Sequence, residues 1–250
     1  MNIFKDIIYV NKEAGKKTIE SFKKNWIIIF TGFVYTLLNI AIYGLLGTLL
    51  SGPLFILSGI IAALVSAAMV SNYLYLLFNI INYNRVTIQD FKNGFTYFLR
   101  KIYIVIFIGY IATRLLGLVS GAFGSISAIL IPLLYISALV ILNPLPETIY
   151  LKYYDSWESI METADFMKDN WLNWAIPNII FSILLYVFTG NTLLNIFNTH
   201  ISFNFIFNIN GLGMYLVGQI IFSIMMIYRG HLYKLLSGST RRKRMFMNKF

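Results

Sequence analysis

Long stretches of apolar residues alternate with short polar segments along most of this chain. A helix needs about 20 mostly apolar residues to cross the roughly 30 Å hydrocarbon layer of a bilayer. Six stretches meet this requirement: residues 26–50, 54–81, 102–122, 125–142, 172–189 and 212–235. The pattern therefore predicts an all-α fold, a polytopic membrane bundle of six transmembrane helices.

Small turn residues join the first four predicted helices in pairs. Ser51-Gly52-Pro53 separates the first helix from the second, and residues 121–124 (Gly-Ala-Phe-Gly) separate the third from the fourth. Clusters of Gly and Pro of this length are typical of tight turns. We therefore expect two helical hairpins whose turns lie on the outer side of the membrane.

The basic residues predict which side of the membrane the chain ends face. Lysine and arginine in short loops favour the cytoplasmic side. All of them except Arg114 lie before the first helix, between the second and third, between the fourth and fifth, or near the end of the chain. We predict a multi-pass protein of the cytoplasmic (inner) membrane with both termini in the cytoplasm. Its parts are an amphipathic segment 1–25, a membrane domain 26–236 and a polybasic tail 237–250.

The composition agrees with this class. Hydrophobic residues make up 58% of the chain and charged residues 12%, whereas a soluble domain carries about 25% charged residues. The net charge of +10 follows from the membrane topology, so nucleic acid is not an expected partner. The absence of cysteine excludes disulfides, thiolate metal sites and cysteine nucleophiles. Abundant Ile, Asn, Lys, Phe and Tyr favour a bacterial source.

Three similar segments precede the first, third and fifth predicted spans. They are TIESFKKNWIIIF from Thr18, GFTYFLRKIYIVIF from Gly94 and TADFMKDNWLNWAI from Thr163. Each reads as a short interfacial helix that leads directly into an apolar span. Two explanations stay open. Either the chain contains a threefold helix-plus-hairpin repeat, or the segments resemble each other because aromatic and charged residues gather at the headgroup level of any span.

Five of the ten acidic residues lie in one short stretch before the fifth span. Their spacing of 3, 4, 3 and 4 places them on one helical face: Asp155, Glu158, Glu162, Asp165 and Asp169. The opposite face is largely apolar, which predicts an amphipathic helix at the membrane surface. A linear stripe spreads carboxylates apart, whereas a metal needs converging ligands. We therefore expect a solvated or paired face, with no metal and no cofactor.

A carboxylate face beside an anionic inner leaflet favours a basic partner. The segment before the first span is also expected to be an amphipathic helix, and four lysines form a stripe along it: Lys12, Lys16, Lys23 and, at the margin, Lys24. We predict that the acidic face docks on this stripe or on the basic loop 85–101.

Two further basic features are candidate contacts for lipid phosphate or another anion. Arg114 lies inside the third span, in the outer half of the bilayer. Its side chain either reaches the outer headgroups or binds a phosphate. The tail either holds anionic lipid or serves only as a topology signal, and its candidate residues are Arg241, Arg242, Lys243 and Arg244.

Three segments carry a resemblance to known proteins. They are residues 84–91 (NRVTIQDF), 143–147 (NPLPE) and 159–171, which leads into the fifth span. With these segments the chain resembles six-span bacterial membrane proteins of the YciC-like kind. More loosely it is similar to the membrane domain attached to some glycerophosphodiester phosphodiesterases. The resemblance implies the six-helix architecture and supplies no catalytic residues.

The sequence contains no phosphate-binding loop, zinc motif or serine-nucleophile motif. We therefore expect a non-enzymatic membrane protein of the cell envelope that contacts lipid or binds a partner membrane protein. The alternative is a transport protein, or the membrane subunit of an ABC-type exporter driven by a separate ATPase. No Asp or Glu lies inside a predicted span. A transporter needs a polar path near mid-membrane, and its candidate lining is Asn39, Tyr110, Arg114, Asn178 and Gln219.

Overall fold

A computed structural model of the chain describes residues 3–49, 55–190, 192–201, 209–240 and 243–244. Within these ranges the backbone forms α-helices and short 3-10 helices, without a β-strand. In chain order the elements are α1 (Ile3–Lys24), η1 (Trp26–Phe30), α2 (Thr31–Leu49), α3 (Phe55–Tyr83), α4 (Ile88–Tyr97), α5 (Leu99–Phe123), η3 (Gly124–Ile126), α6 (Ser127–Ile141), α7 (Leu145–Leu151), α8 (Ser156–Thr189) and α9 (Ile209–Ser237). The predicted all-α class is confirmed.

Six helical segments in the described residues are long and apolar enough to cross a membrane. They are Trp26–Thr48, Leu57–Tyr83, Leu99–Leu118, Ser127–Leu151, Ser156–Thr189 and Gly211–Ser237. Each overlaps one predicted span, so the six-span prediction is confirmed. The fifth starts at Ser156 rather than at Leu172, because the predicted surface helix and the fifth span form one continuous helix, α8.

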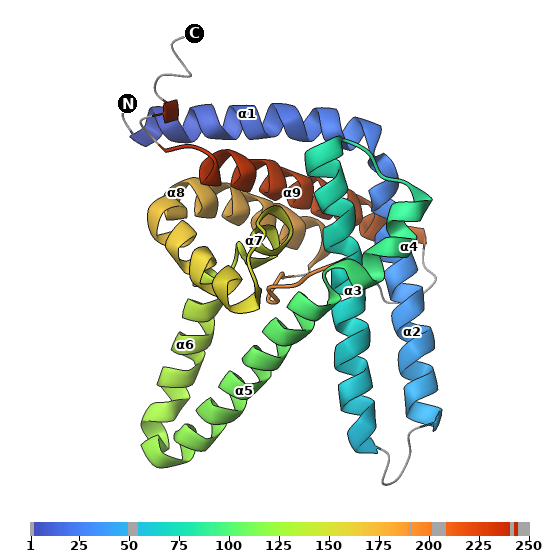
Figure 1. Cartoon of the computed structure of the whole chain (residues 1–250), viewed down its shortest axis with the longest axis vertical. Helices are drawn as coiled ribbons and strands as arrows, with labels where there is room; N and C mark the ends of the chain where they lie inside the picture. Colours follow the sequence, from blue (N-terminus) through green and yellow to red (C-terminus); the bar gives the residue numbers. More distant parts are fainter. Residues whose placement is uncertain (1–2, 50–54, 191, 202–208, 241–242, 245–250) are drawn as a thin grey trace.

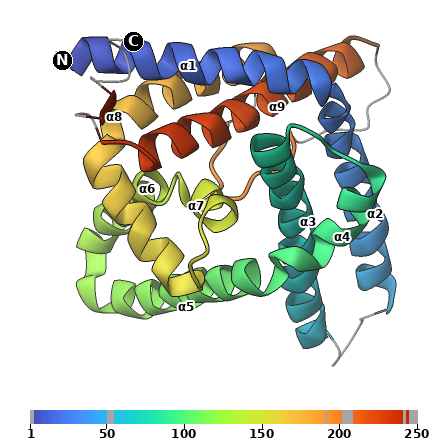
Figure 2. The ribbon, with the colours of Figure 1, turned by 45° about the horizontal axis from the view of Figure 1, so that its top comes forward.

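Two hairpins extend away from a layer that contains α1 and α9 (Figure 1). Helices α2 and α3 form the first hairpin, and α5 and α6 form the second. The turn between α5 and α6 lies at the opposite end of the molecule from the start of α1 and the end of α9. Helix α5 begins against α3 and then runs away from it, so the two hairpins diverge (Figure 2).

The three similar segments each become a helix that leads into an apolar span. The first two are separated from their spans by a break in the helix, at Asn25 and at Phe98, where the backbone leaves the helical conformation. The third runs on without a break inside α8. A helix that leads into an apolar span therefore occurs three times in the described residues, twice as a separate helix and once as the first part of α8.

Helix α8 has three faces rather than the two predicted. Its buried face carries small hydroxyl residues and then aromatic ones, including Ser159, Thr163 and Phe166. Small residues let this face approach neighbouring helices closely. The acidic stripe runs beside it, and Trp157 and Trp171 are exposed on the remaining surface. Phe166 belongs to the buried face, and its ring packs on Tyr233 of α9 with centroids 4.5 Å apart.

The described part of the connection between α8 and α9, residues 192–201, contacts α2 and α9. The backbone N–H of Ile201 donates to Gln219 Oε1 of α9 at 3.2 Å. The ring of His200 lies 6.2 Å from that of Tyr35 in α2. The side chains of Ile196 and Phe197 pack against the core.

Helix α7 is the centre of the packing. It contacts α3, α8 and α9, and its residues from Leu145 to Tyr150 are all buried. Two apolar clusters meet around it, one between α3 and its neighbours and one between α1, α8 and α9. A helix of seven residues has too few backbone hydrogen bonds to be stable alone, so side-chain contacts must hold it.

Candidate functional site

A buried ion pair between Glu147 of α7 and Arg229 of α9 is the main candidate site. Pro144 precedes α7 and Pro146 lies in its first turn. Proline is favoured there because its fixed φ suits a helix start and its missing N–H has no partner to lose. The two prolines thus separate α6 from α7 and favour the start of α7 at Leu145. This places Glu147 in the first turn of α7, with its side chain inside the molecule.

The pair has a forked geometry. Arg229 Nε donates to Glu147 Oε1 at 2.8 Å, and Arg229 Nη2 donates to Glu147 Oε2 at 2.9 Å. The same Nη2 donates to the carbonyl of Asn143 at 2.6 Å. Glu147 is 0% exposed and Arg229 is 5% exposed. Two parallel charge-assisted bonds of this kind are among the strongest side-chain contacts.

Trp174 of α8 completes the surroundings of the pair. Arg229 Cζ lies 5.2 Å from the centroid of its ring, a cation–π contact that strengthens when water is excluded. Trp174 Nε1 donates to Asn143 Oδ1 at 2.9 Å. Asn143 therefore joins the arginine and the tryptophan, so the pair ties together α7, α8, α9 and the turn after α6.

Hydroxyl groups line the next layer. Thr148 Oγ1 lies 2.9 Å from both Thr163 Oγ1 and the Tyr233 hydroxyl, which links α7 to α8 and α9. In the described part of the chain, the buried hydroxyls of Tyr73 and Tyr150 have no hydrogen-bond partner. Polar groups in such a low-dielectric interior interact strongly with the nearby charges.

The sequence analysis missed both members of this pair. It placed Glu147 in a loop and took Arg229 as one of the residues that set the orientation. The statement that no acidic residue lies in a span is corrected, since Glu147 belongs to the candidate span Ser127–Leu151. The signal was the single acid after Asn-Pro-Leu-Pro, with no other acid between the first residue of α5 and residue 155.

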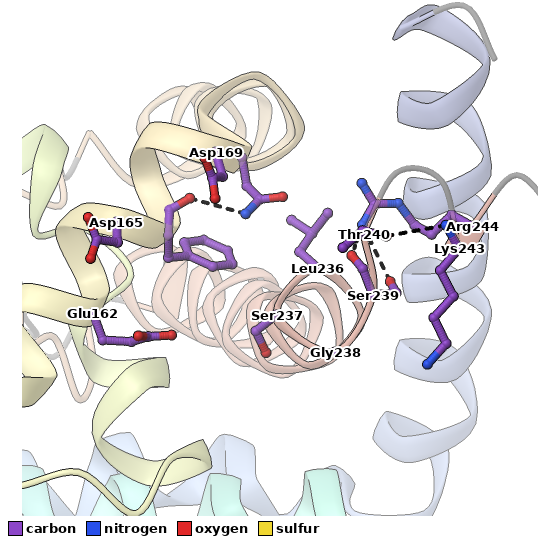
Figure 3. Close-up of a pocket in the computed structure, with 12 residues that line it drawn as sticks. Glu162, Asp165, Asp169, Leu236, Ser237, Gly238, Ser239, Thr240, Lys243 and Arg244 are labelled. Atoms are coloured by element: carbon purple, nitrogen blue, oxygen red, sulfur yellow. Dashed lines mark hydrogen bonds between the residues drawn. The ribbon is translucent and has the colours of Figure 1, made fainter.

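The acidic stripe lies on the wall of a separate groove. Glu162, Asp165 and Asp169 line a cavity of about 840 Å³, and Lys243 and Arg244 line it from the far side (Figure 3). Asp155 and Glu158 instead form a reciprocal cap at the start of α8. Within the described residues, no carboxylate of the stripe lies within ion-pair distance of a lysine or arginine.

The predicted docking of the stripe on α1 or on the basic loop 85–101 stays a prediction. Among the described residues, no ion pair joins the stripe to Lys12, Lys16, Lys23 or Lys24. The physical reason is the orientation of α1, which buries Val10 and Ala14 and leaves those lysines exposed. The alternative basic loop is closer: Ser156 Oγ donates to the carbonyl of Lys101 at 3.1 Å, and Asp155 acts electrostatically on Lys101.

Arg244 is not a lipid contact, which corrects another prediction. Its side chain is 3% exposed and pairs with Asp6 of α1, Nε to Oδ1 at 2.9 Å and Nη2 to Oδ2 at 3.0 Å. Asn173 of α8 donates to the same carboxylate at 3.2 Å. Lys243 is exposed. Arg241 and Arg242 lie outside the described residues.

Arg114 and the other candidate residues of a polar path lie in different surroundings. Arg114 is exposed on α5, with its Cζ 5.0 Å from the ring centroid of Tyr110. At this exposed position the side chain can reach lipid headgroups or bind a phosphate, the two contacts predicted for it. Tyr110 is exposed too, whereas Asn178 and Gln219 are buried, so the five candidate residues do not converge on one path.

The two histidines contact neighbouring helices. His231 Nε2 lies 3.0 Å from Ser21 Oγ, which joins α9 to α1. Burial lowers the pKa of His200, in the connection between α8 and α9, below its ordinary value.

No family model, no curated protein and no solved structure matches this chain. The resemblance to the YciC-like proteins therefore stays a prediction.

Proposed function

We propose that the chain is a non-enzymatic integral protein of the bacterial cytoplasmic membrane that contacts anionic lipid through α1 and offers its surface to a partner membrane protein. The observation that carries this proposal is the distribution of side chains around α1. Apolar side chains are exposed along one side of it, Phe4, Ile8 and Ile19. Ile8 alone is 65% exposed.

A row of lysines lies beside this apolar row. At 100° per residue, Lys5, Lys12, Lys16 and Lys23 share one narrow strip of the helix, next to the exposed apolar residues. All four are exposed. A helix with an apolar strip bordered by lysine is suited to the interface of an anionic membrane, where each lysine near the surface contributes about 1 kcal/mol of attraction.

The remaining side of α1 explains why the helix stays with the protein. Val10 and Ala14 pack against α8 and α9, and the Asp6–Arg244 pair closes the same side. Figure 1 shows α1 lying crosswise to α2 and α3, at the end of the hairpin. A helix in this position would lie along the membrane surface when the hairpins cross the bilayer.

Spin labelling tests this placement. The chain has no cysteine, so Ile8→Cys and Glu20→Cys each carry one nitroxide in otherwise unlabelled protein. In nanodiscs that contain phosphatidylglycerol, we expect the label at residue 8 to collide with dissolved oxygen and the label at residue 20 to collide with a water-soluble nickel complex. Equal exposure of both labels to the nickel complex would contradict lipid contact by α1.

Transport is the second candidate function, as a passive pore or as the membrane subunit of an exporter driven by an ATPase. The buried Glu147–Arg229 pair favours it, because charged residues inside membrane segments often belong to transport pathways. Proteoliposomes loaded with a pH-sensitive dye test it. A proton leak that the chain introduces and Glu147→Gln abolishes would support transport, and liposomes as tight as empty ones would count against a passive pore.

A further inference from the structure

A small cavity lies where α4 meets α5 and where α7 ends, apart from the groove beside the acidic stripe. Its volume is about 170 Å³, enough for about five waters at roughly 30 Å³ each. The lining side chains come from α3, α4, α5, α7 and the connection to α8, and the charged ones are Lys101 and Lys152. No carboxylate of the described residues lines the cavity.

Aromatic rings fix the shape of this cavity. Phe78 stacks on Tyr97 with ring centroids 6.2 Å apart, and Tyr97 meets Phe98 edge to face at 4.8 Å. Tyr153, which also lines the cavity, is 95% exposed. Exposed tyrosines are typical of the headgroup level of a membrane protein, so the cavity lies where a lipid headgroup can reach it.

The amino groups of both lysines are unengaged in the described part of the chain. Neither donates a hydrogen bond to a described residue or lies within ion-pair distance of a described carboxylate. Asp155 is the acidic residue that acts on Lys101, and it is not among the described residues that line the cavity. Each ammonium therefore keeps its three donors for a ligand.

The chemistry of the lining selects a doubly charged oxyanion. A phosphomonoester carries a charge of about −1.5 to −2 at neutral pH and three strong acceptor oxygens, which matches two ammonium groups. A tyrosine hydroxyl is protonated at neutral pH, since its ordinary pKa is about 10, so Tyr97 can donate to the ligand. A phosphodiester brings one charge and matches the two lysines less well.

We propose that Lys101 and Lys152, with the hydroxyls of Tyr97 and Tyr153, bind a phosphomonoester group at the membrane surface. The group belongs either to a lipid headgroup or to free phosphate, since both present the same oxygens. This site gives a specific ligand to the lipid contact proposed above and rests on that function.

Lipid retention tests the site. The chain is placed in phosphatidylcholine nanodiscs with phosphatidic acid, or with the phosphodiester phosphatidylglycerol, and bound lipid is counted by native mass spectrometry. Replacing both lysines by Gln should weaken retention of phosphatidic acid by roughly 30-fold, since each lysine contributes about 1 kcal/mol. The matched control, Lys92→Gln with Lys168→Gln, removes two exposed lysines elsewhere and should change little.

Two further measurements separate the possible outcomes. Arg in place of both lysines keeps the charge and should restore binding if the Gln variant is folded. Inorganic phosphate is also titrated into detergent-solubilised protein and followed by phosphorus NMR. Its signal should broaden only if free phosphate is the ligand. If the protein retains phosphatidic acid and the phosphate signal does not broaden, the ligand is the lipid. The site would be overturned if the wild type and the Gln variant bound both probes equally. It would also be overturned if the wild type retained phosphatidylglycerol as well as it retains phosphatidic acid. The spin-label result on α1 then decides the proposed function separately.

Discussion

Glu147 has no access to solvent, and Arg229 is the residue that compensates its buried charge. Breaking a buried pair by removing one charge typically costs about 3–5 kcal/mol, because the other charge stays buried without compensation. We expect Glu147→Gln to lower the free energy of unfolding by about this amount. Thermal unfolding of the purified protein in detergent would measure it.

Two variants make that measurement decisive. Glu20→Gln removes an exposed acid on α1 and should change stability by about 0.5 kcal/mol at most. Adding Arg229→Met to Glu147→Gln removes the stranded charge and should recover part of the loss. If Glu147→Gln melts like Glu20→Gln, the pair does not hold α7 in place.

Gly230 allows α9 to approach α7 and α3. A Cβ at this position would lie 2.5 Å from the Tyr150 hydroxyl and 2.7 Å from a side-chain atom of Ile81. Overpacking of this kind costs about 1–3 kcal/mol, so we expect Gly230→Ala to lower the melting temperature. The readout is the same thermal unfolding in detergent.

Gly213, in the same helix, is the matched control for Gly230. A Cβ there would meet no atom within 4 Å, so Gly213→Ala should leave stability unchanged or raise it slightly. Tyr150→Phe removes the oxygen that obstructs residue 230, and that hydroxyl has no partner among the described residues. Combining it with Gly230→Ala should restore part of the lost stability, because the contact with Ile81 remains. Failure of this rescue would contradict the close approach.

These residues show where sequence reasoning stops. The positions of Pro144, Pro146 and Glu147 are plain in the sequence, but nothing in it says that Arg229, 82 residues later, forms the other half of the pair. Arg229 is the first of the basic residues near the end of the chain, where a topology signal is the simpler interpretation. Pairing over such a distance is a product of the tertiary fold.

The helices themselves were easier to predict than their packing. Each apolar run became a helix, because backbone groups in lipid must bond within their own segment. The continuity of α8 was not predicted, since its charged first half and apolar second half have different compositions and only the backbone joins them. Its buried face was misassigned because Ser and Thr do not mark a core face in a hydrophobicity pattern.

The connection between α8 and α9 should be sensitive to acid. His200 has a lowered pKa in the folded chain because it is buried, whereas in the unfolded chain its pKa is about 6.5. As pH falls below about 6.5, the unfolded state binds more protons than the folded state, so stability decreases toward the folded pKa. The wild type should therefore lose thermal stability between about pH 7 and pH 5.

Replacing the histidine isolates its share of this loss. His200→Gln cannot titrate, so its melting temperature should fall less over the same pH interval, even if its value at pH 7 is lower. Other acids titrate equally in both proteins, so the difference between the two slopes is the readout. Parallel slopes would show that His200 is not what couples this segment to pH.

The beginning and end of the described chain are fastened to each other. Asp6 of α1 and Arg244 after α9 form a buried pair, and Ser239 accepts a further bond from the same guanidinium. Asp6→Asn removes the charge that holds Arg244, so the segment after α9 should open more often. Limited digestion with trypsin, which cuts after lysine and arginine, should then cleave at Arg244 faster than in the wild type. Glu13→Gln on the same helix should leave the rate unchanged.

The orientation of the whole molecule follows from the same arrangement and can be tested directly. The start of α1 and the end of α9 lie together, while the α5–α6 turn lies at the other end (Figure 1). If basic residues place the termini in the cytoplasm, Ile126 in that turn faces outward. In the cysteine-free chain, a membrane-impermeant maleimide should label Ile126→Cys on intact cells and label Lys243→Cys only after permeabilisation. The reverse result would invert the predicted topology. It would also put Lys101 and Lys152 on the outer surface, where the ligand would have to be an external phosphate.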